Sequence, residues 1–466
     1  MRKLFLFILL ILIVQINTNA QTLSENELIQ IVKKYHPIAL QAKNLIEQAK
    51  TDITEARGAF DPILQTNTTR KELLGNTYYN YQNIGLNIPT WYGIELNAGI
   101  ENVAGNHVDP QKTMNNSSYV GVSFSVIKNM VIDKRRAALE QSKILVSQSE
   151  AEQTIALNNI LYEATNQYWQ WVQAYREWMI INDVIEINQK RINYTKQVVD
   201  IGERPAIDSI EAITQLQYYL SLQNDLYMQM QTASIQLSSY TWKENGVAYN
   251  LPENIMPSTP SFNMNQVENE LPIREELIQE VINNHPELAI YQSKFKFLEI
   301  DKRLKFQELL PDIKIKYNQL GKNYFLNETI TQIPLEKNYQ YGLSFAMPLR
   351  LSQARANFTQ AKLKIEYTKF QQNNKQRFLE NKIREQFNIL TQLKNQISIQ
   401  QNLYENLNIL LKGEQARFEN GESSLFLINS REQKRIETLQ KLTATIAKFY
   451  KQKTALRWAS GILWKD

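Results

Sequence analysis

The sequence contains no cysteine and three histidines among its 466 residues. The absence of cysteine excludes disulfide bonds, thiolate metal ligands and a lipid anchor on a cysteine. The formal net charge is +5, from 52 basic and 47 acidic residues, which is not the strong basic excess of a nucleic-acid-binding protein. There is also no phosphate-binding loop, nucleophile elbow or metal-ligand spacing. The sequence therefore predicts no enzyme, no cofactor and no nucleic-acid partner.

Long apolar runs are also lacking after residue 20, so no membrane-spanning helix is expected there. Residues 1–20 are different, because Arg2 and Lys3 precede the apolar run Leu4–Val14 and the small-residue sequence NTNA. This is the pattern of a secretory signal peptide, with Gln21 as the first residue of the mature chain. We expect an exported protein.

Proline and glycine are absent from residues 136–201, and this stretch belongs to an internal duplication. The interval from Arg136 to Gly202 is equal to the interval from Arg355 to Gly421. The two copies therefore align without a gap at a constant offset of 219, which is both 355 − 136 and 421 − 202. Because the chain is internally duplicated, its length alone does not give the number of domains.

Each copy predicts one very long helix that turns back at its glycine. In the first copy, apolar residues recur at alternating spacings of three and four, which is typical of a packed coiled-coil seam. They are Leu157, Ile160, Ala164, Tyr168, Trp171, Tyr175, Trp178, Ile181, Ile185, Ile192 and Val199, with Asn188 and Thr195 at polar positions of the seam. Gly202 is suited to end the helix and Pro205 to begin the next. With return arms over 206–245 and 424–460, the sequence predicts two long helical hairpins.

An entry helix precedes each hairpin. The first is expected to start after Ser24, which with Glu27 forms a capping-box pattern, and to end near Asp61-Pro62. The interval from His36 to Pro62 equals that from His285 to Pro311, which places the duplication at a second offset of 249, both 285 − 36 and 311 − 62. Both histidines are interpreted as structural residues.

Strands are predicted between the entry helices and the hairpins, at about 63–126 and 312–348. Residues 120–126 and 339–347 alternate apolar with small or polar residues, and residues 94–98 and 313–317 place charged side chains on one face. This alternation is typical of a barrel in lipid around a wet lumen, and equally of a soluble sandwich with one face on a protein core. The residues suited to interfacial aromatic girdles are Tyr78, Tyr79, Tyr81, Trp91, Tyr92, Tyr119, Tyr339 and Tyr341.

The two copies differ in this strand region. The interval from Pro62 to Gly121 is longer than the interval from Pro311 to Gly342, so the first copy carries an insertion. The excess predicts either one additional hairpin or a long external loop. The expected organisation is a signal peptide at 1–20, a first repeat at 21–245, an irregular connector at 246–270 and a second repeat at 271–466.

Four main strands per chain are too few to close a transmembrane barrel, for which about eight is the minimum. Open sheet edges do not occur in lipid, so several chains must share one barrel. The same symmetry would assemble the hairpins into a helical tube.

The sequence resembles the TolC-like outer-membrane efflux channel family over nearly the whole mature chain. The resemblance is carried by His36-Pro37 and His285-Pro286, by the sequence ARGAFDPIL, by the tip sequence Gly202–Asp208 and by the duplication at offset 219. It implies a mainly α fold with a membrane β part: a homotrimer in which each chain gives four strands to a twelve-stranded barrel in the outer membrane. The hairpins would form a periplasmic tunnel that docks an adaptor and an inner-membrane pump.

The resemblance also implies a constriction at the periplasmic tips. In the family, Asp, Arg and Tyr contacts close the tunnel there. Asp208 matches the aspartate, while Phe418 and Ser423 stand where the tyrosine and arginine partners are expected. Arg204 and Arg417 are nearby cations that would substitute, and Gly202 and Gly421 are the turn glycines. Asp208 is equally interpreted as an acidic residue of a helical first turn.

The predicted function is passive conduction, as the outer-membrane exit duct of a tripartite efflux or type I secretion system. The alternative is a non-conducting periplasmic coiled-coil adaptor or envelope scaffold. An adaptor usually needs one hairpin with compact β domains, whereas this chain predicts two hairpins and alternating strands. An enzyme is a distant third interpretation.

Overall fold

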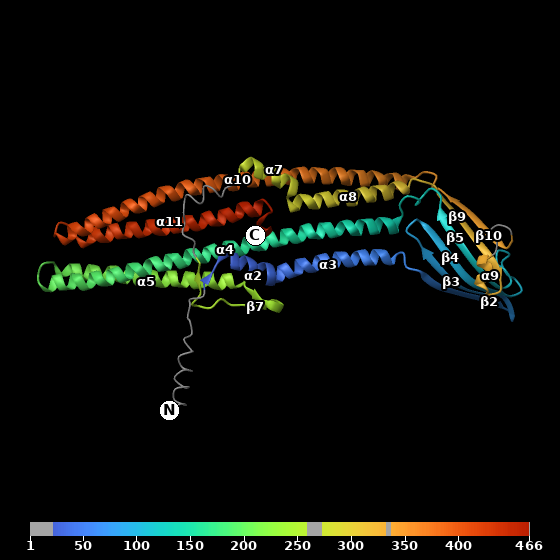
Figure 1. Cartoon of the computed structure of the whole chain (residues 1–466), viewed down its shortest axis with the longest axis horizontal. Helices are drawn as coiled ribbons and strands as arrows, with labels where there is room; N and C mark the ends of the chain where they lie inside the picture. The colour runs from blue at the N-terminus through green and yellow to red at the C-terminus, as the bar shows by residue number, and fades with distance from the viewer. Residues whose placement is uncertain (1–21, 259–272, 332–336, 466) are drawn as a thin grey trace, which may run out of the picture. The chain divides into compact units, whose positions relative to one another are not determined.

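The computed structural model describes residues 22–258, 273–331 and 337–465. The predicted signal peptide at 1–20 and the second half of the predicted connector therefore lie outside the described residues. The chain divides into two compact units, which Figure 1 draws in one view. One, here called the hairpin unit, contains the residues up to Lys43 with Gln153–Pro286 and Gln376–Asp466. The other, the sheet unit, contains Asn44–Glu152 and Glu287–Lys375.

The predicted entry helix is wrong as a single helix, because it is broken at His36. Helix α2 (Glu25–Tyr35) begins at the predicted capping box, in which Ser24 and Glu27 bond to each other's backbone N–H groups. His36 then takes an extended conformation, and α3 (Pro37–Gly58) follows. A residue before proline is disfavoured in the helical region, which explains the break. The second repeat has the same break at His285, between α7 (Arg274–Asn284) and α8 (Pro286–Gln307).

The long helical hairpins are confirmed. Helices α4 (Lys134–Asp200) and α5 (Ala206–Ser238) form the first, and α10 (Ser352–Glu419) and α11 (Leu425–Ala459) form the second. At about 1.5 Å per residue, α4 is on the order of 100 Å long. The first return arm is shorter than expected. It ends at Ser238, and residues from Trp242 enter two short strands and the 3₁₀ turn η1 (Glu244–Gly246).

The predicted seam residues of α4 lie in the hairpin unit, where they form part of its buried clusters. Ile160, Tyr168 and Trp171 lie in one buried cluster, and Ile181 lies in another with Tyr219 of α5 and Ile436 of α11. The two polar seam positions, Asn188 and Thr195, are buried as well. The repeat of threes and fours thus identifies the buried face of the helix, including the positions at which it buries polar groups.

The sheet unit contains one six-stranded antiparallel sheet, so the prediction of four main strands is wrong by one hairpin. Its strands are β2 (Ile63–Leu73), β3 (Asn76–Pro89), β4 (Ile94–Ala104), β5 (Asn115–Ser125), β9 (Asp312–Lys322) and β10 (Tyr339–Ala346). They lie in the order β10-β9-β5-β4-β3-β2, as Figure 1 shows. The first repeat supplies four strands and the second supplies two. The insertion in the first repeat therefore forms an additional hairpin, which is one of the two predicted alternatives.

Short elements complete the described chain. Strand β1 (Thr22–Leu23) pairs in parallel with β8 (Met256–Pro257), and β6 (Trp242–Lys243) pairs with β7 (Val247–Ala248). Helix α9 (Leu326–Thr331) lies against β5 and β9, where the Thr329 hydroxyl is 2.8 Å from that of Ser118. The chain closes with the 3₁₀ turn η2 (Leu463–Lys465).

Candidate functional site at the hairpin tips

The two tip turns share one backbone geometry. Gly202 and Gly421 both have φ of +78°, the left-handed conformation that glycine adopts without steric cost. At the first tip, the N–H of Glu203 donates to the carbonyl of Val198 and that of Gly202 to Val199. The second tip repeats this pair of bonds from Glu422 to Arg417 and from Gly421 to Phe418. This is the Schellman arrangement, which satisfies the last carbonyls of a helix.

Arg204 joins the two tips. Its guanidinium is 3.4 Å from the carboxylate of Asp208 on its own hairpin. It also lies over the ring of Phe418, 3.5 Å from the ring centroid, and donates to the Phe418 carbonyl at 2.7 Å. Three of the predicted tip residues are therefore brought into one contact, in which a cation meets a carboxylate, an aromatic face and a carbonyl.

The other two predicted side chains lie around Glu414 instead. The Ser423 hydroxyl donates to the Glu414 carboxylate at 2.6 Å. Arg417 is 3.9 Å from Glu414 and 4.0 Å from Glu422, and its side chain is largely exposed. Arg204 is thus the arginine paired with Asp208, and Arg417 forms a separate set of contacts at the second tip.

A buried polar network near the tips was not predicted. Arg191 of α4 and Glu432 of α11 form a two-pronged ion pair with distances of 3.0 and 2.7 Å. Asn188 donates to the same carboxylate at 3.0 Å, and Tyr219 is 3.5 Å from it. The Glu432 side chain is 1% exposed, so the carboxylate depends on these donors for its stability. The network fastens the first hairpin to the second.

Two further contacts extend this network. Asn429 accepts from Arg191 at 3.3 Å and donates to Glu211 at 3.1 Å. Burial raises the pKa of the Tyr219 hydroxyl, and the charge of Glu432 raises it further, so Tyr219 remains a neutral donor. The sequence signal for the network was Asn188 itself, an amide in a seam of apolar residues, but its partners on α11 had no pattern of their own.

The sheet has one mainly apolar and one mainly polar face over the part that includes Leu86, Leu96 and Val122, whereas Asn80 and Asn102 make the far end of the apolar face polar. The paired residues Ile88, Leu96, Val122, Tyr317 and Tyr341 form one row across five strands. The neighbouring row on the opposite face consists of Asn87, Asn97, Gly121, Asn318 and Gln340. Residues directly opposite in a ladder share a face, so the alternation of each strand is in register with that of its neighbours. Two of the predicted girdle residues, Tyr81 and Tyr119, lie on the polar face beside Asn83.

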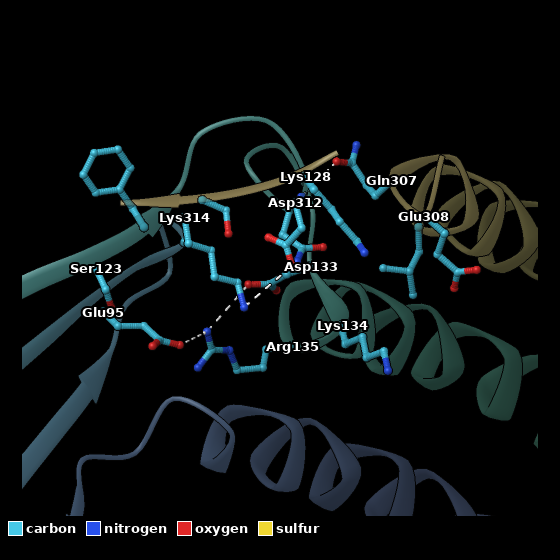
Figure 2. A pocket seen from close by; sticks show the side chains of 15 residues that line it. Glu95, Ser123, Lys128, Asp133, Lys134, Arg135, Gln307, Glu308, Asp312 and Lys314 are labelled. Carbon is cyan, nitrogen blue, oxygen red and sulfur yellow. Dashed lines mark hydrogen bonds and ion pairs between the residues drawn. The ribbon is translucent and has the colours of Figure 1, made fainter. Parts of the chain in front are cut away.

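The sheet unit also holds a pocket of about 550 Å³ at the strand ends (Figure 2). Charges of both signs line it, and they pair with one another: Arg135 lies 2.8 Å from Glu95, and Lys314 lies 3.7 Å from Asp312. Figure 2 shows Arg135 and Lys314 turned toward these carboxylates. Four acidic and four basic side chains line the pocket, so it carries no net formal charge, and we assign no ligand to it.

Within the described ranges, no group of three or more histidine and acidic residues is arranged to hold a metal ion. Among the same residues, no helix is both long enough and apolar enough to cross a membrane.

No protein-family model and no curated protein matches the sequence. The fold is nevertheless that of known outer-membrane channels. The open-state MtrE outer membrane channel of Neisseria gonorrhoeae is 13% identical, with a TM-score of 0.66 over 94% of this chain and 89% of that one. The CmeC outer membrane channel of Campylobacter jejuni is 13% identical, with a TM-score of 0.65 over 94% and 86%. The outer membrane protein VceC of Vibrio cholerae is 13% identical, with a TM-score of 0.63 over 94% and 96%. The mainly α fold with long hairpins and a smaller β part, which the resemblance to TolC-like channels implies, is therefore confirmed.

Proposed function

We propose that three copies of this chain form an outer-membrane channel that conducts substrates passively, as the exit duct of a tripartite efflux or type I secretion system. The hairpins would extend into the periplasm, where a periplasmic adaptor and an inner-membrane pump dock. The channel itself would have no enzymatic step and no cofactor. Energy for transport would come from the pump.

The observation that supports this proposal most strongly is the two-faced sheet. One face carries exposed apolar side chains, including Leu96, Tyr341 and Leu343 at 43%, 73% and 70% exposure. The other carries amides, hydroxyls and charged groups such as Glu95 and Lys316. A sheet in lipid around an aqueous lumen requires this division. The folds of MtrE, CmeC and VceC support the same assignment.

We further propose that the hairpin tips form the constriction of the tunnel. Asp208 is held by Arg204, and Arg204 is held by the ring and carbonyl of Phe418. This arrangement makes the position of the acidic group of the first hairpin depend on the second hairpin. Separation of the tips on adaptor binding would break the contact and widen the aperture.

Single-channel conductance in planar bilayers, measured beside the mass of the protein in detergent, tests the proposal. A trimer-sized particle with a small, steady conductance is expected. Asp208→Ala should increase that conductance severalfold, because it removes the carboxylate that Arg204 holds at the tip. Asp225→Ala, which removes an exposed carboxylate of the same helix α5 away from the tip, is the matched control and should leave the conductance unchanged.

The other outcomes separate the parts of the proposal. If Asp208→Ala and Asp225→Ala both conduct like the unmodified protein, the duct stands and the constriction lies elsewhere. A monomeric mass without insertion into the bilayer contradicts the channel and favours the envelope scaffold.

A further inference from the structure

The additional hairpin of the first repeat is part of the sheet interior. Strands β3 and β4 lie between β2 and β5 rather than at an edge. The ladder between β3 and β4 runs from Asn80 to Pro89, and that between β4 and β5 runs from Ile94 to Val103, with ten residue pairs in each. The hairpin therefore separates β2 from β5, the other two strands of the first repeat.

The apolar face continues without interruption over the added hairpin. Its side chains on this face are Ile84, Leu86, Ile88, Ile94, Leu96 and Ile100, and four of them are more than a third exposed. They stand in register with Val120, Val122 and Phe124 on β5. An external loop has no physical reason to carry such a row, whereas a strand of a wall in lipid requires one. At eleven residues or more, β3 and β4 also have the length of strands that cross a bilayer.

Both edges of the sheet are open. Every residue of β2 and every residue of β10 is exposed. The six strands alternate in direction, so β2 and β10 run antiparallel to each other across the sheet. A second copy of this chain therefore offers the matching edge, because β10 of one copy is oriented to pair with β2 of the next. A ring closed in this way leaves no free edge in lipid.

We propose that the membrane wall of the assembled channel contains eighteen strands, six from each of three copies, instead of the twelve that the family resemblance implies. The inference rests on the proposed trimeric channel. The added hairpin then acts as a spacer that widens the barrel.

The dimensions of the sheet unit support this wall. Strands about 4.8 Å apart with a tilt of about 40° give eighteen strands a circumference of roughly 110 Å, and twelve strands roughly 75 Å. Each sheet unit also holds four helical segments, from α3, α4, α8 and α10. Twelve such segments in a ring, about 8–10 Å apart, have a circumference of roughly 95–120 Å. The eighteen-stranded wall matches this ring, whereas a twelve-stranded wall would have to narrow.

If the barrel is wider, another part of the duct limits the size of the solutes that can pass. Barrel diameter grows roughly in proportion to strand number, and barrels of about 16–18 strands leave an aqueous channel. The polar face carries amides together with charges of both signs, Glu95 and Glu101 on β4 and Lys314 and Lys316 on β9. The outer-membrane section would therefore pass large polar solutes, and the hairpin tips would set the limit.

Lipid-phase quenching tests the position of the added hairpin. The chain contains no cysteine, so each introduced cysteine is its sole thiol. We would label Leu86→Cys and Leu96→Cys with an environment-sensitive maleimide fluorophore, reconstitute the protein in liposomes and add nitroxide-labelled lipids. Strong quenching is expected at both positions. Asn87→Cys and Asn97→Cys, one residue further along the same strands, are the matched controls and should be quenched severalfold less.

Two further measurements separate this inference from the proposed function. Val122→Cys and Leu343→Cys lie on strands that face lipid in a wall of either size, so both should be quenched. Cysteine pairs with one member on β2 (Leu64, Thr66 or Thr68) and one on β10 (Tyr341, Leu343 or Phe345) should cross-link three copies. If these expectations hold while Leu86→Cys and Leu96→Cys are quenched no more than their controls, the eighteen-stranded wall is wrong and the trimeric channel stands. If Val122→Cys and Leu343→Cys are not quenched either, the channel itself is contradicted.

Discussion

The tips of the two hairpins have the same backbone and different side chains. At the offset of 219 between the copies, Arg204 corresponds to Ser423, Asp208 to Leu427, and Phe418 to Val199. The glycine conformation and the two Schellman bonds recur at both tips, whereas the ion pair occurs at the first tip and the aromatic ring at the second. The duplication has thus kept the turn, and the side chains have become complementary. A contact between unlike partners holds the tips together.

The same contrast extends to the buried network. The residues that correspond to Arg191 and Glu432 at this offset are Leu410 and Ile213, so the ion pair is built once and not twice. Substitutions at equivalent positions of the two repeats should therefore change stability equally where the backbone is shared, and unequally where the side chains have diverged.

The largest loss of stability is expected from Glu432→Ala. This substitution leaves the Arg191 guanidinium buried without its carboxylate, which typically costs about 3–5 kcal/mol. Thermal unfolding of the purified protein should show a clear fall in Tm. Glu437→Ala is the matched control on the same helix, since its carboxylate is 3.8 Å from Lys434 and 45% exposed, and an exposed pair contributes about 1 kcal/mol or less.

A double variant sharpens this prediction. Replacing Arg191 and Glu432 together by methionine removes both charges, so much of the lost stability should return. If Glu432→Ala and Glu437→Ala lower Tm equally, the buried network does not hold the hairpins together.

Intermediate losses of stability are expected when the tip glycines are replaced. No atom lies within 4 Å of a Cβ built on Gly202 or Gly421, so alanine meets no steric clash at either tip. The left-handed conformation alone should cost roughly 1–2 kcal/mol at each site. Gly202→Ala and Gly421→Ala are therefore expected to lower Tm by similar amounts. Unequal shifts would show that the two turns are not equivalent in energy.

Gly413→Ala provides the control of opposite sign. Gly413 lies inside α10, also with open space at its Cβ position but without a left-handed conformation. Alanine is the better helix former by about 1 kcal/mol, so this variant should be slightly more stable than the unmodified chain. A loss of stability here would mean that the glycine serves a contact between copies.

The smallest effects concern the helices that open the two repeats. Helix α2 has a complete capping box, whereas α7 begins at Ile273 without a side-chain cap. Ser24→Ala should lower stability by about 1 kcal/mol. Ile273→Ser should raise it by a similar or smaller amount, because Glu276 already stands at the third helical position and Ile273 is 61% exposed. Chemical denaturation monitored by circular dichroism would measure both changes, and a loss of stability in Ile273→Ser would contradict this comparison of the caps.

The regular parts of the fold were predictable because their residues obey local rules. The seam of α4, the cap at Ser24 and the turns at Gly202 and Gly421 depend on spacing and backbone preference, which a single sequence shows. The break at His36 was missed although Pro37 signals it, because the apolar pattern on both sides suggested one continuous helix. The number of strands stayed open because the excess in the first repeat fits either an additional hairpin or an external loop, although residues 94–98 alternate as a strand does.

The candidate site was predictable in part for a similar reason. The position of Asp208 relative to the turn glycine identified the tip, and the contacts of Arg204 with Asp208 and Phe418 agree with the residues selected there. The partner choice between Arg204 and Arg417 depended on which side chain reaches across to the other hairpin, and this is a long-range property. The pairing of Arg191 with Glu432 joins residues 241 positions apart, so no local pattern indicates it.

The contact between Arg204 and Phe418 also constrains how this protein can change length during evolution. The distance along the chain from Arg136 to Gly202 equals that from Arg355 to Gly421, and the two ends meet at the tips. One inserted residue in α4 moves everything beyond it by about 1.5 Å and rotates it by about 100°. An insertion or deletion in one hairpin would therefore be retained only together with a matching change in the other hairpin. The sheet is subject to no such rule, since a hairpin inserted between two antiparallel strands gives each of them a new antiparallel partner. Lineages of this fold should accordingly vary freely in barrel size while the two hairpins lengthen or shorten in step.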